Sequence, residues 1–99
     1  MKGLTDYQKK FLLYLEDCAV NKAGRVNWKK VNDEESLWVD EWNEEGFVRY
    51  GRIRMKDASS NGHHWVELSE AAWILSATLR RERGIRLFEK REYETTEDR

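Results

Sequence analysis

Few residues in this chain combine the types and the spacing that catalysis or metal binding requires. His63 and His64 are adjacent, but neighbours in an extended segment point to opposite faces, so the pair is poorly placed to chelate one ion. Cys18 is the only cysteine, which excludes an intrachain disulfide and a cysteine-rich metal centre. We expect ordinary strand histidines, a small buried thiol, no metal and no cofactor.

The common catalytic motifs are also missing from the sequence. It has no phosphate-binding glycine loop, no nucleophile elbow, no zinc-binding His-Glu-x-x-His and no cysteine cluster. Carboxylates are abundant, but they fall on helix faces that we expect to be exposed, where nothing would desolvate an acid–base pair. The sequence therefore predicts a protein that binds, not an enzyme.

Carboxylates dominate residues 33–45, a segment without Lys or Arg. On a helical wheel Trp38, Val39 and Trp42 fall within an arc of about 100°, which predicts the core face. Leu37 lies on the opposite side, surrounded by Asp33, Glu34, Asp40, Glu41, Glu44 and Glu45. This surface would suit a basic protein partner, or it could mimic nucleic acid toward an enzyme that binds it. A solvated charged face is the alternative.

Basic residues dominate the stretch that follows. Between Gly46 and Lys56 there is no acid, and the four basic residues are Arg49, Arg52, Arg54 and Lys56. Tyr50, Arg52 and Arg54 would project from one face of a strand, where arginines beside an aromatic ring could bind a phosphate backbone or stack on bases. Two alternatives stay open: the arginines pair with the carboxylates of residues 33–45, or they keep an edge strand soluble.

Trp73 stands out in the last predicted helix because it lies off the expected core face. Its neighbours on that side are Ser76, Ala77 and Arg80. An exposed Trp beside small residues and an Arg is typical of an interface anchor, and a homodimer through this helix is one use. The alternative is that residues 85–88 fold back and cover the indole.

The first helix is predicted over residues 6–22. Thr5 and Gln8 form a capping-box pattern at its start, and Gly24 follows its end. Helical spacing predicts a core face made of Tyr7, Phe11, Leu12, Leu15, Cys18 and Ala19.

Two further helices and a hairpin follow from similar signals. Residues 25–27 could form a short extended bridge before a short helix at residues 28–31. Asn32 caps a helix over residues 33–45, which Gly46 ends.

Alternating polarity predicts a strand over residues 47–55. A turn-rich loop over residues 56–62 leads to a return strand at residues 63–68.

The last clear helix starts at a Ser69 cap, runs to Arg83 and stops at Gly84. Its predicted core face is Ala71, Ala72, Ile74, Leu75, Thr78 and Leu79. Residues 85–88 form a short apolar patch, either a strand or a helical extension. Residues 89–99 are charged, and we expect a flexible tail.

The bulk properties fit one small domain. The chain has 99 residues, of which 37% are charged, yet twelve aromatic side chains argue against disorder. A net charge of −1 gives no global attraction to nucleic acid or to an anionic membrane, so recognition would depend on local patches. Without an apolar signal core or a membrane-length apolar run, we expect a cytoplasmic protein that binds no membrane.

The order of elements resembles a winged helix-turn-helix domain. The residues that carry the resemblance are Trp38-x-x-x-Trp42-x-x-x-Gly46-Phe47-Val48, then Trp65-Val66-Glu67-Leu68-Ser69-Glu70, with Leu4-Thr5 before the first helix. It covers residues 4–84. It implies an α+β fold: a single domain over residues 1–88 with three helices, a hairpin wing and a C-terminal helix, followed by the tail at residues 89–99.

The third helix of that family normally enters the DNA major groove. Here the corresponding residues 33–45 depart from the pattern, because phosphates repel a carboxylate-rich helix. Our first hypothesis is therefore a small regulator or inhibitor, of the kind that phages and mobile elements encode. It would bind a basic protein through Leu37, Asp40, Glu41 and Glu44.

Two other hypotheses remain. One is a DNA-binding transcription regulator, dimeric through its last helix, that contacts DNA through the basic wing. The other is a structural subunit of a larger assembly that uses Trp73.

Overall fold

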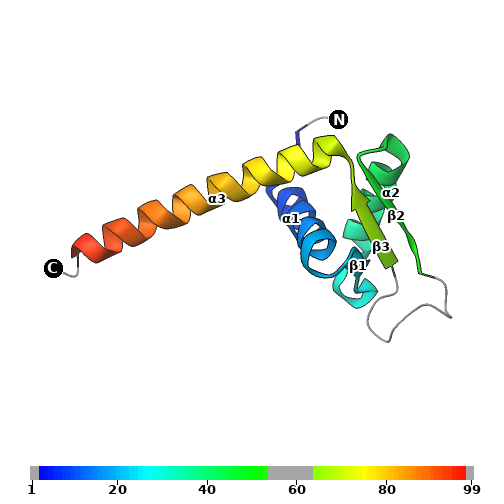
Figure 1. The fold of residues 1–99 in the computed structure, drawn as a ribbon, viewed down its shortest axis with the longest axis horizontal. Helices are drawn as coiled ribbons and strands as arrows, with labels where there is room; N and C mark the ends of the chain where they lie inside the picture. Colours follow the sequence, from blue (N-terminus) through cyan, green and yellow to red (C-terminus); the bar gives the residue numbers. More distant parts are fainter. Residues whose placement is uncertain (1–2, 54–63, 98–99) are drawn as a thin grey trace.

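In the described part of the chain, three α-helices and one three-stranded antiparallel sheet form an α+β fold (Figure 1). The computed structural model describes residues 3–53 and 64–97, with side chains described as far as residue 90. In chain order the elements are α1 (Asp6–Asn21), β1 (Arg25–Val26), the 3₁₀-helix η1 (Trp28–Lys30), α2 (Asp33–Glu45), β2 (Val48–Arg52), β3 (His64–Leu68) and α3 (Glu70–Glu97). The predicted α+β class is confirmed.

Capping boxes fix the starts of α1 and α2, as the sequence predicts. The Gln8 backbone N–H donates to Thr5 Oγ1 at 3.2 Å, and the Thr5 N–H donates to Gln8 Oε1 at 2.9 Å. The same pair of bonds joins Asn32 and Glu35, at 2.8 and 3.0 Å. Each box satisfies two backbone donors that a helix start would otherwise leave without partners.

The sheet has the order β1-β3-β2, so β3 lies in the centre. β2 and β3 form the predicted hairpin, with Val48 opposite Leu68 and Arg52 opposite His64. β2 ends earlier than the predicted residue 55, and residues 54–63 lie outside the described residues.

β1 is the predicted short bridge, and Gly24 brings it against β3. The Val66 N–H donates to the Gly24 carbonyl oxygen at 2.8 Å. A Cβ at position 24 would lie 3.0 Å from the Val66 carbonyl oxygen, and the φ of Gly24 is +79°. Only glycine fits both the close approach and the left-handed backbone without strain.

α1 is the centre of the core, because it packs on α3 as well as on the sheet and α2. Leu12, Leu15 and Cys18 are fully buried from α1. The Phe11 ring lies 5.8 Å from the Trp42 ring, which links α1 to α2. Burial of side chains this large contributes about 1.5–3 kcal/mol each, so this cluster supplies much of the stability.

Two residues of α1 differ from the predicted single core face. Tyr7 is 75% exposed, so its assignment to the core was wrong, while Leu13 is 8% exposed. Leu13 is buried because α3 covers a second face of α1, where Leu13 and Leu79 line the same cleft. A one-sided helical pattern cannot anticipate a helix that is covered from two directions.

α3 continues to Glu97, so the predicted stop at Gly84 was wrong. Residues 85–88 extend this helix, and the alternative of a strand is excluded. An interior glycine costs a helix only about 1 kcal/mol, and a glycine acts as a stop signal only where its backbone adopts the left-handed conformation. The helix passes residue 88, our predicted domain boundary, without a break, and the flexibility of the tail stays a prediction.

The face of α3 that packs on the body is narrower than predicted. Ala72, Ser76 and Leu79 are buried, and Leu75 is partly buried. Ile74 is 60% exposed, and Ala71 and Thr78 are also exposed, so these three were wrongly assigned to the core. Beyond Leu79, residues 80–90 are all exposed.

Candidate protein-binding surface on α2

Core contacts, together with the glycine turn at its C-terminal end, hold α2 in one orientation. Val39 and Trp42 are buried, and Trp38 packs against the core. At the C-terminal end, Gly46 adopts a φ of +79° and turns the chain into β2, and the Phe47 N–H donates to the Trp42 carbonyl oxygen at 2.9 Å. The opposite face of α2 therefore points to solvent in a fixed geometry.

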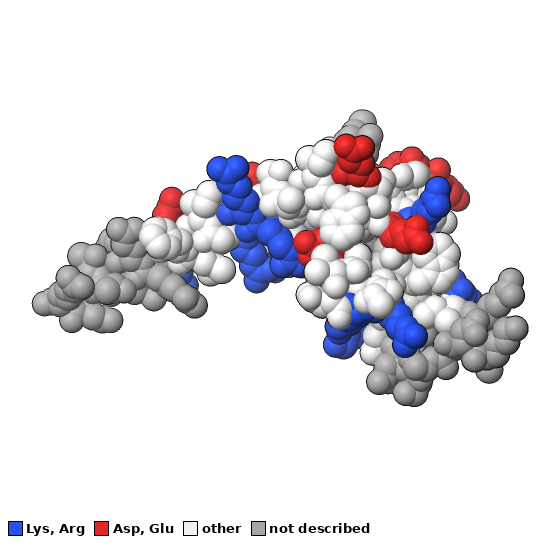
Figure 2. Space-filling view, viewed as in Figure 1, with Lys and Arg blue, Asp and Glu red and all other residues white. Residues whose placement is uncertain are grey.

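The outward face of α2 has the predicted composition. Leu37 is 70% exposed at its centre. The exposed carboxylates around it are those of Asp33, Glu34, Asp40, Glu41, Glu44 and Glu45. We call this set, with Leu37, the α2 surface. Figure 2 shows Asp and Glu side chains at the end of the body where α2 lies in Figure 1.

No basic side chain neutralises the α2 surface within the described part of the chain. Its six carboxylates form no ion pair and no hydrogen bond to another described side chain. Arg49 and Arg52 are exposed and make no ion pair with α2. For these two arginines the predicted alternative of pairing with the acidic helix is not observed. The surface therefore keeps its negative field.

The described residues of the predicted basic wing do not form one surface. Tyr50 is partly buried against the core, and its ring stacks on His64 at 5.0 Å. Arg49 is exposed on the other face of β2, opposite Glu67 on β3. Arg54 and Lys56 lie outside the described residues. Of the predicted wing residues that the structure describes, only Arg52 shares the Tyr50 face and is exposed.

Tyr50 is linked electrostatically to α2. Burial raises the pKa of Tyr50 to about 12, and the negative charge of Asp40 adds to this effect. The Tyr50 backbone N–H donates to Asn43 Oδ1 of α2 at 3.2 Å. Tyr50 thus helps to hold β2 against α2, and it is poorly placed to stack on a nucleic-acid base.

Trp73 is 39% exposed, as predicted, but it belongs to a different region of the molecule. α3 packs mainly on α1, whereas α2 packs mainly on β2. Residues 85–88 continue the helix, so they do not fold back over Trp73. The structure therefore separates Trp73 from Leu37, although the sequence marked each of them as a candidate for protein binding.

Sequence reasoning missed a second basic cluster, at the β1 and η1 end of the body. Lys22, Arg25, Lys29 and Lys30 are exposed there, and Trp28 is 47% exposed. Figure 2 shows Lys and Arg side chains at this end of the body. The signal was present, because residues 22–30 contain four basic residues and no acid, as many as the predicted wing.

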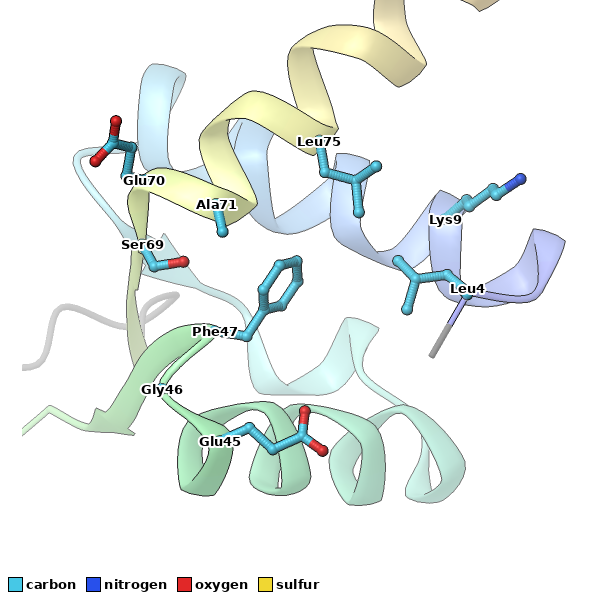
Figure 3. A pocket seen from close by; sticks show the side chains of 10 residues that line it. Leu4, Lys9, Glu45, Gly46, Phe47, Ser69, Glu70, Ala71 and Leu75 are labelled. Carbon is cyan, nitrogen blue, oxygen red and sulfur yellow. The ribbon is translucent and has the colours of Figure 1, made fainter. Parts of the chain in front are cut away.

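An apolar groove lies beside the C-terminal end of α2, and the sequence did not reveal it. Phe47 forms its floor, with Leu4, Ala71 and Leu75 around it and Glu45 at the edge toward α2 (Figure 3). Its volume is about 1020 Å³. It brings together three distant segments of the chain, which is why no local pattern marks it. The groove could accept an apolar side chain next to the α2 surface.

Cys18 is placed for packing and not for reaction. It is fully buried on α1, and burial raises the pKa of its thiol. A protonated, inaccessible thiol is neither a nucleophile nor a metal ligand. Among the described residues, no three His, Cys, Asp or Glu side chains lie close enough to hold a metal ion. None of the helices within residues 3–53 and 64–97 has the length and apolar character of a membrane span.

Comparisons with known proteins add no further residues to these surfaces. No protein-family model, no curated protein and no solved structure matches this chain. The similarity to winged helix-turn-helix domains stays a prediction, and the function rests on the geometry and charge of the chain's own surfaces.

Proposed function

We propose that this chain is a non-enzymatic regulatory or inhibitory protein that binds a basic protein through the α2 surface. Leu37, Asp40, Glu41 and Glu44 make the contact. The observation that carries the proposal is the absence of any cation against these carboxylates among the described residues. Their charge is therefore available to a partner.

The arrangement of the α2 surface also supports a protein partner. Leu37, 70% exposed, is the apolar centre of a charged ring. Apolar anchors surrounded by polar rims are the usual anatomy of protein interfaces. The groove beside Phe47 lies next to the ring through Glu45 and would extend the contact.

Duplex DNA is the wrong ligand for this helix. DNA binding depends on neutralising phosphates with cations, and α2 contains seven acids and no base. If the fold is used as a winged helix, α2 occupies the position of the base-reading helix with the opposite charge. A basic, nucleic-acid-handling protein is the partner that this inversion favours.

Charge reversal tests the proposal. Glu41→Lys combined with Glu44→Lys should abolish capture of the partner from native-host extract, with the fold unchanged by circular dichroism. Glu67→Lys with Glu82→Lys is the matched control, because both residues are exposed, lie off α2 and change the net charge equally. The proteins of interest are those retained by the wild-type chain and the control, lost by the α2 variant, and insensitive to nuclease.

Two outcomes would count against the proposal. One is capture that disappears with nuclease. The other is capture that survives reversal of Glu41 and Glu44, since the α2 surface would then make no contact.

The second candidate function is DNA binding by basic residues away from α2. It is favoured by exposed Arg49 and Arg52, which lack ion pairs to α2, and by exposed Lys29 and Lys30 on η1. We expect such binding to weaken steeply with salt, and Arg52→Glu with Lys30→Glu to abolish it. No affinity for random duplex DNA at low salt would eliminate this candidate.

A further inference from the structure

A cleft of about 440 Å³ lies between α1 and α3, which pack on each other (Figure 1). We call it the α1–α3 cleft. Four basic side chains line it: Lys9 and Lys10 from α1, and Arg83 and Arg86 from α3. Figure 2 shows Lys and Arg side chains gathered where α3 leaves the body. Cations from two helices therefore meet around one hollow.

Helical spacing explains why these side chains share the α1–α3 cleft. Arg83 and Arg86 follow Leu79 by four and seven positions, so all three lie on one face of α3. The two lysines precede Leu13 of α1 by four and three positions, which places them beside the residue that α3 covers. The contact between the two helices therefore brings both pairs of cations to the same place.

The four cations of the α1–α3 cleft form no ion pair within the described part of the chain. Arg80 behaves differently, because its guanidinium lies 2.6 Å from the Glu16 carboxylate. Two carboxylates, those of Asp6 and Glu82, also line the cleft, so four positive charges minus two negative charges leave an excess of two. The cleft therefore keeps a positive field that the described residues do not neutralise.

The α1–α3 cleft also has an apolar part. Leu13 and Leu79 line it and are each 8% exposed. The aliphatic stems of lysine and arginine side chains add to this surface, because only their charged ends require water. A volume of about 440 Å³ is within the size range of small-molecule sites. The cleft therefore fits a small organic anion better than a bare inorganic ion.

We propose that the α1–α3 cleft binds a small phosphate monoester, with the phosphate among the four cations and the organic group against Leu13 and Leu79. A phosphate monoester carries close to two negative charges at neutral pH, which matches the excess of positive charge. Arginine also presents paired N–H donors that suit phosphate oxygens. This site goes beyond the proposed function, because it shares no residue with the α2 surface.

Titration of the ¹⁵N-labelled full chain with phenyl phosphate tests the site. Backbone amide signals of residues 9–13 and 79–86 should shift and saturate, with a Kd of about 0.1–1 mM. The amides of residues 22–30 should shift less and without saturation. That segment has four exposed basic side chains of its own, so it is an internal control for an anion that merely collects at surface cations.

Two further ligands separate the charged and the apolar parts of the cleft. Phenyl sulfate resembles phenyl phosphate in size but carries one charge fewer, so it should bind about tenfold more weakly. Inorganic phosphate has the charge without the ring. It should bind at least about threefold more weakly than phenyl phosphate, because it leaves Leu13 and Leu79 without a contact.

Neutral substitutions locate the site. Lys10→Gln combined with Arg86→Gln should weaken phenyl phosphate binding at least about tenfold, because both exposed cations line the cleft. Lys29→Gln combined with Lys30→Gln is the matched control. It removes the same charge from exposed residues of η1 and should leave the Kd within about twofold of wild type.

Glu82 provides a test in the opposite direction. Glu82→Gln removes a carboxylate from the cleft and should tighten phenyl phosphate binding by about threefold. Glu67→Gln, an exposed substitution on β3, should have no such effect. A gain of affinity cannot be explained by misfolding, whereas equal affinities in these two variants would count against the site.

Three results would overturn the proposal. The first is no saturating shift at up to about 20 mM phenyl phosphate. The second is an equal loss of binding in the two double variants, which would indicate an anion that only collects at surface cations. The third is tighter binding of duplex DNA than of phenyl phosphate at residues 9–13 and 79–86, which would assign the cleft to a nucleic-acid backbone. None of these measurements involves Glu41 or Glu44, so their failure would not affect the proposed function.

Discussion

Gly46 and Gly84 are the same residue type in opposite settings. Gly46 has a φ of +79° and ends α2. Gly84 lies inside α3, and a Cβ at this position would meet no atom of another part of the chain within 4 Å. One glycine is required by the backbone, and the other weakens the helix that contains it. This contrast explains why sequence reasoning placed the end of α2 correctly and the end of α3 wrongly.

Alanine at these two positions should have effects of opposite sign. Gly46→Ala should lower the free energy of unfolding by about 1 kcal/mol, because Cβ disfavours the left-handed conformation. Gly84→Ala should increase helix content and stabilise α3 locally by up to about 1 kcal/mol. Urea denaturation and circular dichroism measure the two effects. A neutral Gly46→Ala would contradict the assigned role of Gly46.

Partly buried tyrosines make the free energy of unfolding depend on alkaline pH. Burial raises the pKa of Tyr50 to about 12, above its ordinary value of about 10, and burial also raises the pKa of Tyr14 and of the Cys18 thiol. The folded state therefore holds these protons to higher pH than the unfolded state does. The stabilisation is complete at neutral pH and is lost as pH rises through the range from about 10 to 12.

The urea midpoint should therefore fall as pH rises above about 10. Tyr50→Phe should reduce that slope because it removes one of the titrating groups. Tyr7→Phe is the matched control, since Tyr7 is 75% exposed and should leave the slope unchanged. Equal slopes for wild type and Tyr50→Phe would show that Tyr50 does not contribute to the pH dependence.

At the scale of elements, α3 is joined to α1 where it leaves the body. Arg80 Nη2 lies 2.6 Å from Glu16 Oε1 and donates to the Leu13 carbonyl oxygen at 3.1 Å. The Glu16 side chain is only 14% exposed, so this pair is better shielded than a typical surface ion pair. The planar guanidinium presents its N–H donors in a rigid fork, so it reaches a carboxylate and a carbonyl together in a fixed geometry.

Replacing Arg80 should loosen α3 from α1. Arg80→Ala should cost about 1–2 kcal/mol of unfolding free energy, because Glu16 is left partly buried without a cation. Arg80→Lys should recover less than half of that loss. Arg83→Ala, an exposed neighbour, should change stability by less than about 0.5 kcal/mol, and guanidinium denaturation compares the three variants. A loss in Arg83→Ala equal to that in Arg80→Ala would remove the special role of Arg80.

Local signals made much of the fold predictable. The capping boxes at Thr5 and Asn32 depend on residues three positions apart, so they can be identified without knowing the fold. The two-sided burial of α1 and the exposure of Ile74 depend on where α3 crosses α1, which no local pattern contains. For the same reason the α2 surface was predictable from one helix, whereas the groove beside Phe47 was not.

The whole molecule consists of a compact body and one projecting helix. Its extents are 58 × 32 × 24 Å, and the longest reflects α3 beyond the body (Figure 1). In the described part of α3, the last residue buried against the body is Leu79. Stability should therefore reside in the body, and the rest of α3 should depend on it.

A chain that ends after Arg83 should still fold. We expect its unfolding free energy to change by less than about 1 kcal/mol, because an exposed helical extension contributes little. Thermal denaturation of the full and the truncated chain at equal concentration gives the comparison. Helix content should fall by the fraction of all helical residues that lies within residues 84–97. Loss of cooperative unfolding in the truncated chain would show that the extension stabilises the body.

The projection of α3 has a further consequence for attaching the chain to a tag or a solid support. α3 packs mainly on α1, whereas α2 packs mainly on β2. A group joined near residue 90, where the described side chains of α3 are exposed, would be held away from the body by a stiff helical spacer. Leu37 and the carboxylates around it would then stay accessible to a partner, so this end of α3 is the site of choice for immobilising the chain in binding assays.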